Sequence, residues 1–257
     1  MTVSFPFHGE LFPAPAKKYE ETVFFVPFFE GKKAQIHRHI EFVNGLGFDA
    51  FAFELEEGFS PWRPPVSTRG RFGFKHVYAD QIEQLLNMID GDKIVFSFSN
   101  PTGGAIEALA RRRCADIKAL IADSGPSGKL VRSIYNLYAR EKKIPTLFGR
   151  LAATPFLSLL WSPHLHGDLG DELKEFPKHF PILSIRGWKD PLISPDQIDA
   201  VFAPHAQLDW RKLALPGAEH LNGLRDFPGD YEPPVTRFLK EVAIKLDPPP
   251  LKAENGS

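Results

Sequence analysis

Residues 93–113, KIVFSFSNPTGGAIEALARRR, are the stretch that decides the fold of this chain of 257 residues. Residues 94–96 form a short apolar run with a β-branched start, which predicts a strand buried on both faces of a sheet. From Ala105 onward apolar side chains recur at helical spacing, and the consecutive arginines at the end suit a helix C-terminus. A buried strand that turns directly into a helix is typical of α/β proteins.

The turn between this strand and this helix carries a candidate nucleophile, Ser99, in the sequence SFSNPTGG at residues 97–104. A serine on such a sharp turn projects its hydroxyl above the sheet, and the backbone N–H of the next residue points at the same spot. The strained backbone requires small residues two positions before and two after the apex, where Ser97 and Pro101 stand. A second interpretation stays open: a buried strand and a helix joined by polar residues that carry no chemistry.

Composition and charge restrict the class of protein. The length of 257 residues suffices for one large α/β domain with a substantial core, and the net charge of -1 gives no electrostatic reason to expect nucleic acid or an anionic membrane as partner. The single cysteine, Cys114, has no partner for an internal disulfide. No apolar N-terminal run follows a basic start, and no apolar segment is long enough to span a bilayer. We therefore expect a cytoplasmic protein.

Strand and helix patterns alternate along most of the chain. The expected strands are residues 22–27, 49–55, 93–98, 117–122, 181–186 and 208–215. Helical spacing follows most of them, so the fold class is α/β, with a mostly parallel sheet and helices on both faces. Before the first of these strands we expect an edge hairpin of residues 3–7 and 10–12 that turns at His8 and Gly9.

The alternation stops between Ser124 and Lys178, where only helical patterns occur. Two interpretations are open for this insertion: more helical packing on the sheet, or a helical lid over the strand ends, where open α/β sheets bind ligands. The strand–helix rhythm resumes cleanly afterwards, which favours the lid. We thus predict a single domain over residues 1–257, with a core of 1–123 and 179–246, a lid of 124–178 and a disordered tail of 247–257.

Two loops after later strands carry the residue types that complete a catalytic triad with a serine. The sequence GWKDPL at residues 187–192 includes Asp190, and PGAEH at residues 216–220 ends at His220. Asp190 alone would be explained as the cap of the helix that begins near residue 195, and His220 alone as a surface-loop histidine. Their placement after strands, among small residues, favours a catalytic role for both.

These three places together resemble the α/β-hydrolase superfamily. Its members carry serine, aspartate and histidine in this chain order, each after a strand of the sheet. The acid loop of the family is commonly G-x-x-D-P followed by an apolar residue, and its histidine loop is commonly P-G-x-x-H. The resemblance covers the chain from about residue 3 to residue 246. The nucleophile turn departs from the family form G-x-S-x-G, because Ser97 and Pro101 stand where the family has glycines.

The resemblance implies a role for each residue of the triad. Asp190 would hold the imidazole of His220 in the right tautomer and stabilise its charged form. His220 would take the proton of Ser99 as the serine oxygen attacks a carbonyl carbon, and would then return that proton to the leaving group.

The resemblance also implies an oxyanion hole formed by two backbone N–H groups. One belongs to Asn100, directly after the apex, and the other to the loop after the strand 22–27. Most family members have His-Gly-x in that loop, whereas this chain has Pro27-Phe28-Phe29. Phe29 takes the x position and is the expected second donor, with Phe28 as the nearest alternative. Each such donor typically contributes about 10²- to 10³-fold to kcat.

The sequence thus predicts a serine hydrolase that cleaves a carboxylic ester or thioester of a small, largely hydrophobic substrate through an acyl-enzyme, without a cofactor. The 23 phenylalanines and the apolar insertion favour such a substrate, with Phe28, Phe156 and Trp161 as expected substrate-binding side chains. A dehalogenase would need an aspartate at the apex. The alternative is a non-catalytic relative that binds a ligand or protein partner, which the replaced glycines at positions 28, 97 and 101 favour. The sequence leaves a homodimer open.

One further cluster is a candidate metal site. His164, His166 and Asp168 lie close together in the insertion. A His-x-His sequence in a proline-flanked loop, with no third strong ligand nearby, does not make a zinc site. We therefore expect no metal.

Overall fold

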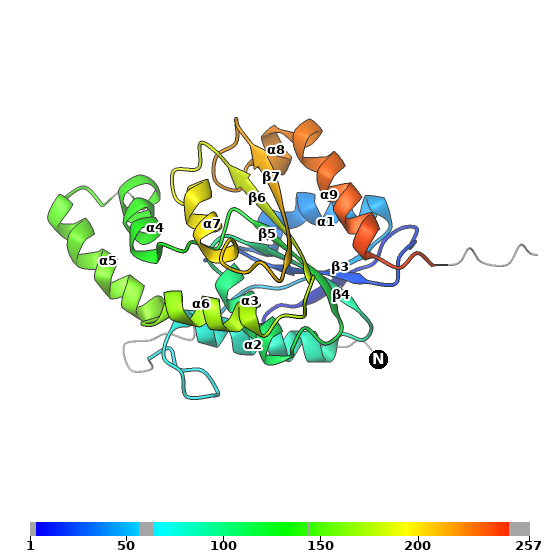
Figure 1. The fold of residues 1–257 in the computed structure, drawn as a ribbon, viewed down its shortest axis with the longest axis horizontal. Helices are drawn as coiled ribbons and strands as arrows, with labels where there is room; N and C mark the ends of the chain where they lie inside the picture. The colour runs from blue at the N-terminus through cyan, green and yellow to red at the C-terminus, as the bar shows by residue number, and fades with distance from the viewer. Residues whose placement is uncertain (1–3, 57–63, 143, 247–257) are drawn as a thin grey trace, which may run out of the picture.

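A seven-stranded sheet forms the centre of the computed structural model, which describes residues 4–56, 64–142 and 144–246. The strand order across the sheet is β1-β3-β2-β4-β5-β6-β7. β1 is antiparallel to β3 and every other neighbouring pair is parallel (Figure 1), which confirms the predicted mostly parallel sheet. The strands are β1 Glu10–Phe12, β2 Thr22–Val26, β3 Asp49–Ala52, β4 Lys93–Phe98, β5 Ile117–Asp123, β6 Pro181–Gly187 and β7 Asp209–Leu215.

The central strands are buried on both faces, because consecutive residues of a strand point to opposite sides. In β2, Phe24 and Val26 belong to one apolar cluster, and Val23 and Phe25 belong to the other. Every residue of β2 and of β4 is buried, as the apolar runs in the sequence predict. The sheet therefore separates two apolar cores.

Helices cover both faces of the sheet (Figure 1). α1, α8 and α9 pack on one face, and α2, α3, α6 and α7 pack on the other. The α-helices are α1 His37–Leu46, α2 Phe74–Met88, α3 Thr102–Arg111, α4 Leu130–Asn136, α5 Leu147–Trp161, α6 Leu165–Lys174, α7 Pro195–Phe202, α8 Gly223–Asp226 and α9 Pro228–Val242. A 3-10 turn, η1 Lys33–Ile36, precedes α1, and a π-helical turn, η2 Leu137–Glu141, continues α4.

Local sequence signals set the ends of several helices. α7 begins with a capping box formed by Ser194 and Gln197, and Pro195 occupies its first position, where a missing N–H costs no helical bond. α1 ends at Gly47, whose φ of 103° is in the left-handed region that favours glycine. These signals fix where the chain leaves each helix and returns to the sheet.

The expected edge hairpin is wrong in its first half. Residue 3 lies outside the described residues, and residues 4–9 contain a bend at Pro6 and a turn at Phe7 and His8 but no strand. Phe7 and His8 have φ of 56° and 52°, and a left-handed backbone cannot continue an extended strand. β1 pairs with β3 instead, so it forms the antiparallel edge of the sheet on its own.

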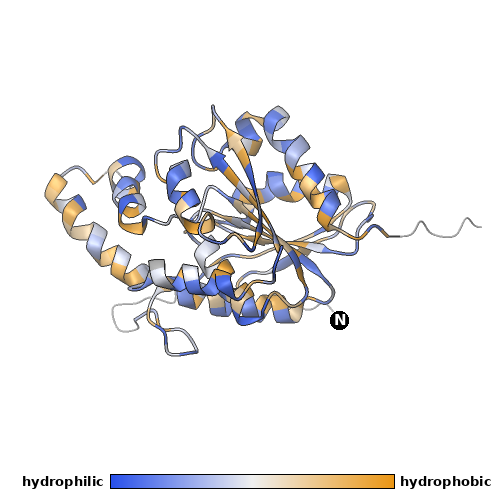
Figure 2. Ribbon diagram, viewed as in Figure 1, coloured by the Kyte–Doolittle hydropathy of each residue, from blue (hydrophilic) through white to orange (hydrophobic). Residues whose placement is uncertain are grey.

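The insertion after β5 divides into two parts. α6 covers the same face of the sheet as α2 and α3, because Leu169 and Leu173 are buried in that core. α4 and α5 extend beyond one end of the sheet (Figure 1), and α5 is largely hydrophobic (Figure 2). α4 and α5 also bury side chains in this core, among them Ile134 and Trp161, and their role as a lid stays a prediction.

Some expectations about the whole chain are outside what the structure describes. The tail of residues 247–257 lies outside the described residues. The division of the chain into a core and a lid stays a prediction. Within the described ranges, no helix has the length and apolar character needed to cross a membrane.

Candidate active site

A sharp turn joins β4 to α3 and carries Ser99. Ser99 has φ of 56°, in the left-handed region where residues other than glycine are strained. Its backbone N–H donates to the carbonyl of Asp123 (2.8 Å), and its own carbonyl accepts from the N–H of Thr102 (3.2 Å). Pro101 directly precedes α3 with φ of -55°, a position where a missing N–H removes no helical hydrogen bond. The proline is therefore compatible with this turn.

The loop after β5 contacts the nucleophile turn so closely that position 125 requires glycine. A Cβ atom on Gly125 would lie 2.3 Å from the carbonyl oxygen of Ser99, which is far inside van der Waals contact. Sequence reasoning missed this residue. The feature that could have revealed it is a glycine just after β5, the strand next to β4, because close approach of two backbones there excludes a side chain.

Three side chains from three loops meet at the carboxyl ends of the strands. Oγ of Ser99 lies 3.0 Å from Nε2 of His220, and Nδ1 of His220 lies 2.6 Å from Oδ2 of Asp190. An ionised carboxylate only accepts hydrogen bonds, so Nδ1 carries the proton and Nε2 is left to accept from the serine hydroxyl. The arrangement can therefore pass a proton from Ser99 to His220.

Backbone contacts hold the acid loop against the histidine loop. Oδ1 of Asp190 accepts from the N–H groups of Leu192 (2.8 Å) and Ile193 (2.9 Å), which leaves Oδ2 for His220. A Cβ atom on Gly187 would lie 2.5 Å from the carbonyl oxygen of Ala218 in the histidine loop. The glycine three residues before Asp190 is therefore required for the approach of the two loops.

A buried cluster behind the histidine loop was not found from the sequence. Asp123 at the end of β5 accepts hydrogen bonds from the hydroxyls of Tyr231 (2.6 Å) and Ser124 (2.8 Å). Burial raises the pKa of the Asp123 carboxyl to about 6. Oγ of Ser124 also accepts from the N–H of Leu221 (3.3 Å), the residue after His220. The cluster thus supports the histidine from behind, and only the fold brings Tyr231 to Asp123.

A cavity of about 590 Å³ opens above Ser99. Apolar and polar side chains line it in similar measure, and the charged ones are Glu30, Glu141, Lys142 and Arg225. The N–H groups of Phe29 and Asn100 donate to no acceptor within the described ranges, and both residues line this cavity beside Ser99. Two free backbone donors beside a serine hydroxyl are the arrangement that an oxyanion requires. The apolar lining comprises Phe28, Phe29, Ile134, Leu137, Leu157, Trp161, Leu192, Ile193 and Leu221.

Of the three expected substrate-binding side chains, Trp161 and Phe28 line this cavity and Phe156 does not. Phe156 is 60% exposed on α5 and is absent from the cavity lining. Leu157 and Trp161 do line the cavity, one helical turn apart. Successive residues of a helix point about 100° apart, so Phe156 faces away when Leu157 faces the site. Trp161 is buried, and its ring packs edge-on against Phe29 with centroids 5.7 Å apart.

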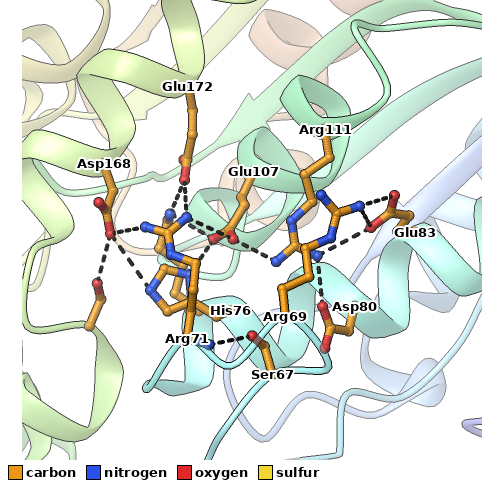
Figure 3. A network of polar contacts seen from close by, with 12 residues as sticks. Ser67, Arg69, Arg71, His76, Asp80, Glu83, Glu107, Arg111, Asp168 and Glu172 are labelled. Atoms are coloured by element: carbon orange, nitrogen blue, oxygen red, sulfur yellow. Dashed lines mark hydrogen bonds and ion pairs between the residues drawn. The ribbon is translucent and has the colours of Figure 1, made fainter.

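A second polar cluster lies between α2, α3 and α6 (Figure 3), and none of its labelled residues lines the cavity. Lys75 is fully buried. Its Nζ lies 2.8 Å from Oε2 of Glu107 and 2.5 Å from Oε1 of Glu172. Nδ1 of His76 lies 2.6 Å from the same Glu107 oxygen. Arg111 adds a 2.7 Å contact to the other oxygen of Glu107. The cluster therefore joins the insertion to the core through charge pairs.

Asp168, one member of the candidate metal cluster, belongs to this polar cluster. Oδ2 of Asp168 lies 2.8 Å from Nη2 of Arg71 and 3.6 Å from Nε2 of His76. Across the parts of the chain that the structure describes, no three histidine, cysteine or acidic side chains are grouped so that they could hold a metal ion.

Comparisons with solved structures identify the fold. An esterase from Pyrococcus furiosus has a TM-score of 0.63 and 17% identity over 93% of this chain and 91% of that one. A thermostable carboxyl esterase from Bacillus coagulans has a TM-score of 0.65 and 16% identity over 91% and 93%. A monoacylglycerol lipase from Paleococcus ferrophilus has a TM-score of 0.60 and 17% identity over 91% and 98%. The sequence matches no protein-family model and no curated protein significantly. The chain therefore has the α/β-hydrolase fold, as the three motifs predicted.

Proposed function

We propose that this chain is a serine hydrolase that cleaves carboxylic esters or thioesters of small, largely hydrophobic substrates. The observation that carries the proposal is the contact of Ser99 Oγ with Nε2 of His220 at 3.0 Å, with Asp190 at 2.6 Å from the other ring nitrogen. The esterases and the lipase among similar solved structures support the same class of reaction.

The reaction proceeds in two halves. His220 takes the proton from Ser99 while the serine oxygen attacks the carbonyl carbon, and Asp190 stabilises the imidazolium that forms. His220 then gives the proton to the departing alcohol or thiol, which leaves an acyl-enzyme on Ser99. Water, deprotonated by His220, attacks the acyl carbon. The bond from that carbon to Ser99 Oγ then breaks, Oγ takes the proton back from His220, and the acid leaves. In each half the N–H groups of Phe29 and Asn100 bind the oxyanion.

The apolar side chains that line part of the cavity support a hydrophobic acyl or alcohol part. A volume of about 590 Å³ lies within the range of small-molecule sites. The rival interpretation, a non-catalytic binding protein, rests on the non-glycine residues Phe28, Ser97 and Pro101. Ser97 is fully buried in β4 and Pro101 precedes α3, so neither displaces Ser99 from His220. Ser97 and Pro101 therefore give the rival little support, and Phe28 in the oxyanion loop is the replacement that still favours it.

Labelling with a fluorophosphonate probe tests the nucleophile. The probe should form a covalent adduct on Ser99, because its hydroxyl lies 3.0 Å from Nε2 of the general base His220. Mass spectrometry of the digested protein locates the adduct. The variant Ser99→Ala should lose labelling, whereas the matched variant Ser97→Ala should retain it. An adduct on Ser97, or a folded protein that remains unlabelled, would support the non-catalytic alternative.

Chain-length preference tests whether α5 selects the substrate. Leu157→Ala and Trp161→Ala should each change the preferred acyl length of p-nitrophenyl esters. The ratio of kcat/KM between a long and a short ester should change by about 10- to 200-fold, because an apolar wall discriminates by about 1–3 kcal/mol. Phe156→Ala is the matched control, since Phe156 neighbours Leu157 but is 60% exposed. Its length profile should not change. A uniform loss across all lengths, with a lower Tm, would mean that these side chains only hold α5 in place.

A further inference from the structure

The side chain of Asn100 connects the nucleophile turn to the insertion. Its Oδ1 accepts from the backbone N–H of Ser127 (3.1 Å), and its Nδ2 donates to Oγ of Ser133 (3.3 Å). Ser127 lies in the loop after β5 and Ser133 lies on α4. Asn100, whose backbone N–H is the proposed oxyanion donor, is therefore hydrogen-bonded through its carboxamide to α4, which lines the cavity.

The partners of Asn100 are themselves buried and held. Ser133 is only 2% exposed, and its hydroxyl donates to the carbonyl of Leu130 (2.9 Å), which leaves its oxygen to accept from Asn100. On the other side, Oγ of Ser127 accepts from Nε2 of Gln197 (3.2 Å), the capping residue of α7. A buried hydrogen-bonded chain of this kind fixes the orientation of its members.

The amide between Ser99 and Asn100 is held at its carbonyl by the N–H of Thr102 (3.2 Å), and the Asn100 side chain adds a second hold, toward α4. The N–H of Asn100 has no acceptor within the described ranges, and Ser99 stands at a strained φ of 56°. A strained turn keeps its geometry only where its surroundings over-determine it. The carboxamide of Asn100 is the side chain of the turn that reaches outward to α4.

We propose that Asn100 and Ser133 are positioning residues for the oxyanion hole, and that α4 sets the direction of the Asn100 N–H through the contact between them. The inference rests on the proposed function. Its consequence is that α4 acts on the chemical step as well as on substrate fit. An oxyanion donor must lie about 2.7–3.1 Å from the charge that develops, and a misplacement of about 1 Å costs up to 100-fold.

Steady-state kinetics of Ser133→Ala with a p-nitrophenyl ester test the inference. We expect kcat to fall about tenfold while KM stays within about twofold, because the hydroxyl orients a donor that acts in the transition state. Asn100→Ala should lower kcat about 10- to 100-fold. The double variant should lose no more than Asn100→Ala, since both remove the same contact. Ser133→Thr, which retains a hydroxyl, should restore most of kcat.

Ser158→Ala is the matched control. Its hydroxyl donates to the carbonyl of Thr154 (2.7 Å) on α5, as the Ser133 hydroxyl does to Leu130 on α4, but it does not contact Asn100. It should leave kcat unchanged. A trifluoromethyl ketone, whose hemiketal oxygen occupies the oxyanion hole, should lose affinity for Ser133→Ala by the same factor as kcat/KM, while the corresponding alcohol should not.

The outcomes separate this inference from the proposed function. A wild-type protein that neither turns over esters nor reacts with the fluorophosphonate probe would overturn both. An active wild type in which Ser133→Ala behaves as Ser158→Ala, or in which Ser133→Ala raises KM alone, would overturn the positioning role and leave the hydrolase assignment intact. A fall in kcat with matching loss of ketone affinity supports it.

Discussion

Ser99→Ala, His220→Ala and Asp190→Asn should each lower kcat for a p-nitrophenyl ester by about 10⁴- to 10⁶-fold. Alanine at position 99 removes the atom that forms the acyl-enzyme, and alanine at position 220 removes the base 3.0 Å from it. Asparagine at position 190 presents an amide whose NH₂ can donate to Nδ1, which favours the tautomer that cannot accept from Ser99. Initial rates at saturating ester, with Tm as the test of folding, measure these losses.

The three groups act as a unit, so the losses should not add. A Ser99→Ala, His220→Ala double variant should retain the same residual rate as either single variant, since the oxyanion donors and the cavity remain. Ser97→Ala, which leaves Ser99, Asp190 and His220 unaltered, serves as the control with near-normal kcat. If His220→Ala kept most of its turnover, the assignment of the base would be wrong.

The candidate site could be predicted from the sequence because each of its parts is short and local. The strand β4 and the turn at Ser99 lie within one continuous segment, and their pattern depends only on neighbouring residues. Asp190 and His220 were each recognisable from a glycine-containing loop after a strand. The order of the strands then brings all three loops to the same edge, because β4, β6 and β7 are parallel members of one sheet.

Contacts between distant segments could not be predicted in the same way. The pair of Asp123 and Tyr231 joins residues 108 positions apart, and neither is part of a motif. Gly125 is required only because the carbonyl of Ser99 lies against it. These requirements come from the approach of loops in the folded chain, and one sequence alone does not contain them.

The direction of α5 was also beyond the sequence. Apolar residues occur almost all round residues 154–161, so no periodicity distinguishes the side that faces the cavity. Phe156 and Leu157 were equally good candidates on hydropathy alone. The structure resolves the choice, since Phe156 is 60% exposed and Leu157 lines the cavity.

Lys75→Met should lower the free energy of unfolding by about 3–5 kcal/mol, the second large effect that we expect. Lys75 is fully buried between Glu107 and Glu172. Removing its charge leaves the two carboxylates without the ammonium that offsets their desolvation. Urea unfolding at pH 7 measures the loss. Arg69→Ala is the control, because Arg69 is 51% exposed beside Glu83 (Figure 3), and exposed pairs contribute less than about 1 kcal/mol.

The loss should depend on pH in a definite direction. Burial raises the pKa of Glu172 to about 7, so the folded chain binds a proton that the unfolded chain releases near 4.5. Stability from this group is therefore present below pH 4.5 and lost as pH rises toward 7. Without Lys75 the ionised Glu172 is opposed by less positive charge, so Lys75→Met should be more destabilising at pH 8 than at pH 5.

A second variant distinguishes the charge effect from lost packing. Lys75→Met combined with Glu172→Gln should recover part of the stability, because it removes a carboxylate left without its partner.

α6, which carries Glu172, directly follows α5, and Trp161 at the end of α5 lines the cavity. If the cluster anchors this end of the insertion, Lys75→Met should also shift the acyl-length profile toward that of Trp161→Ala. A Lys75→Met protein no less stable than Arg69→Ala would contradict the anchoring role.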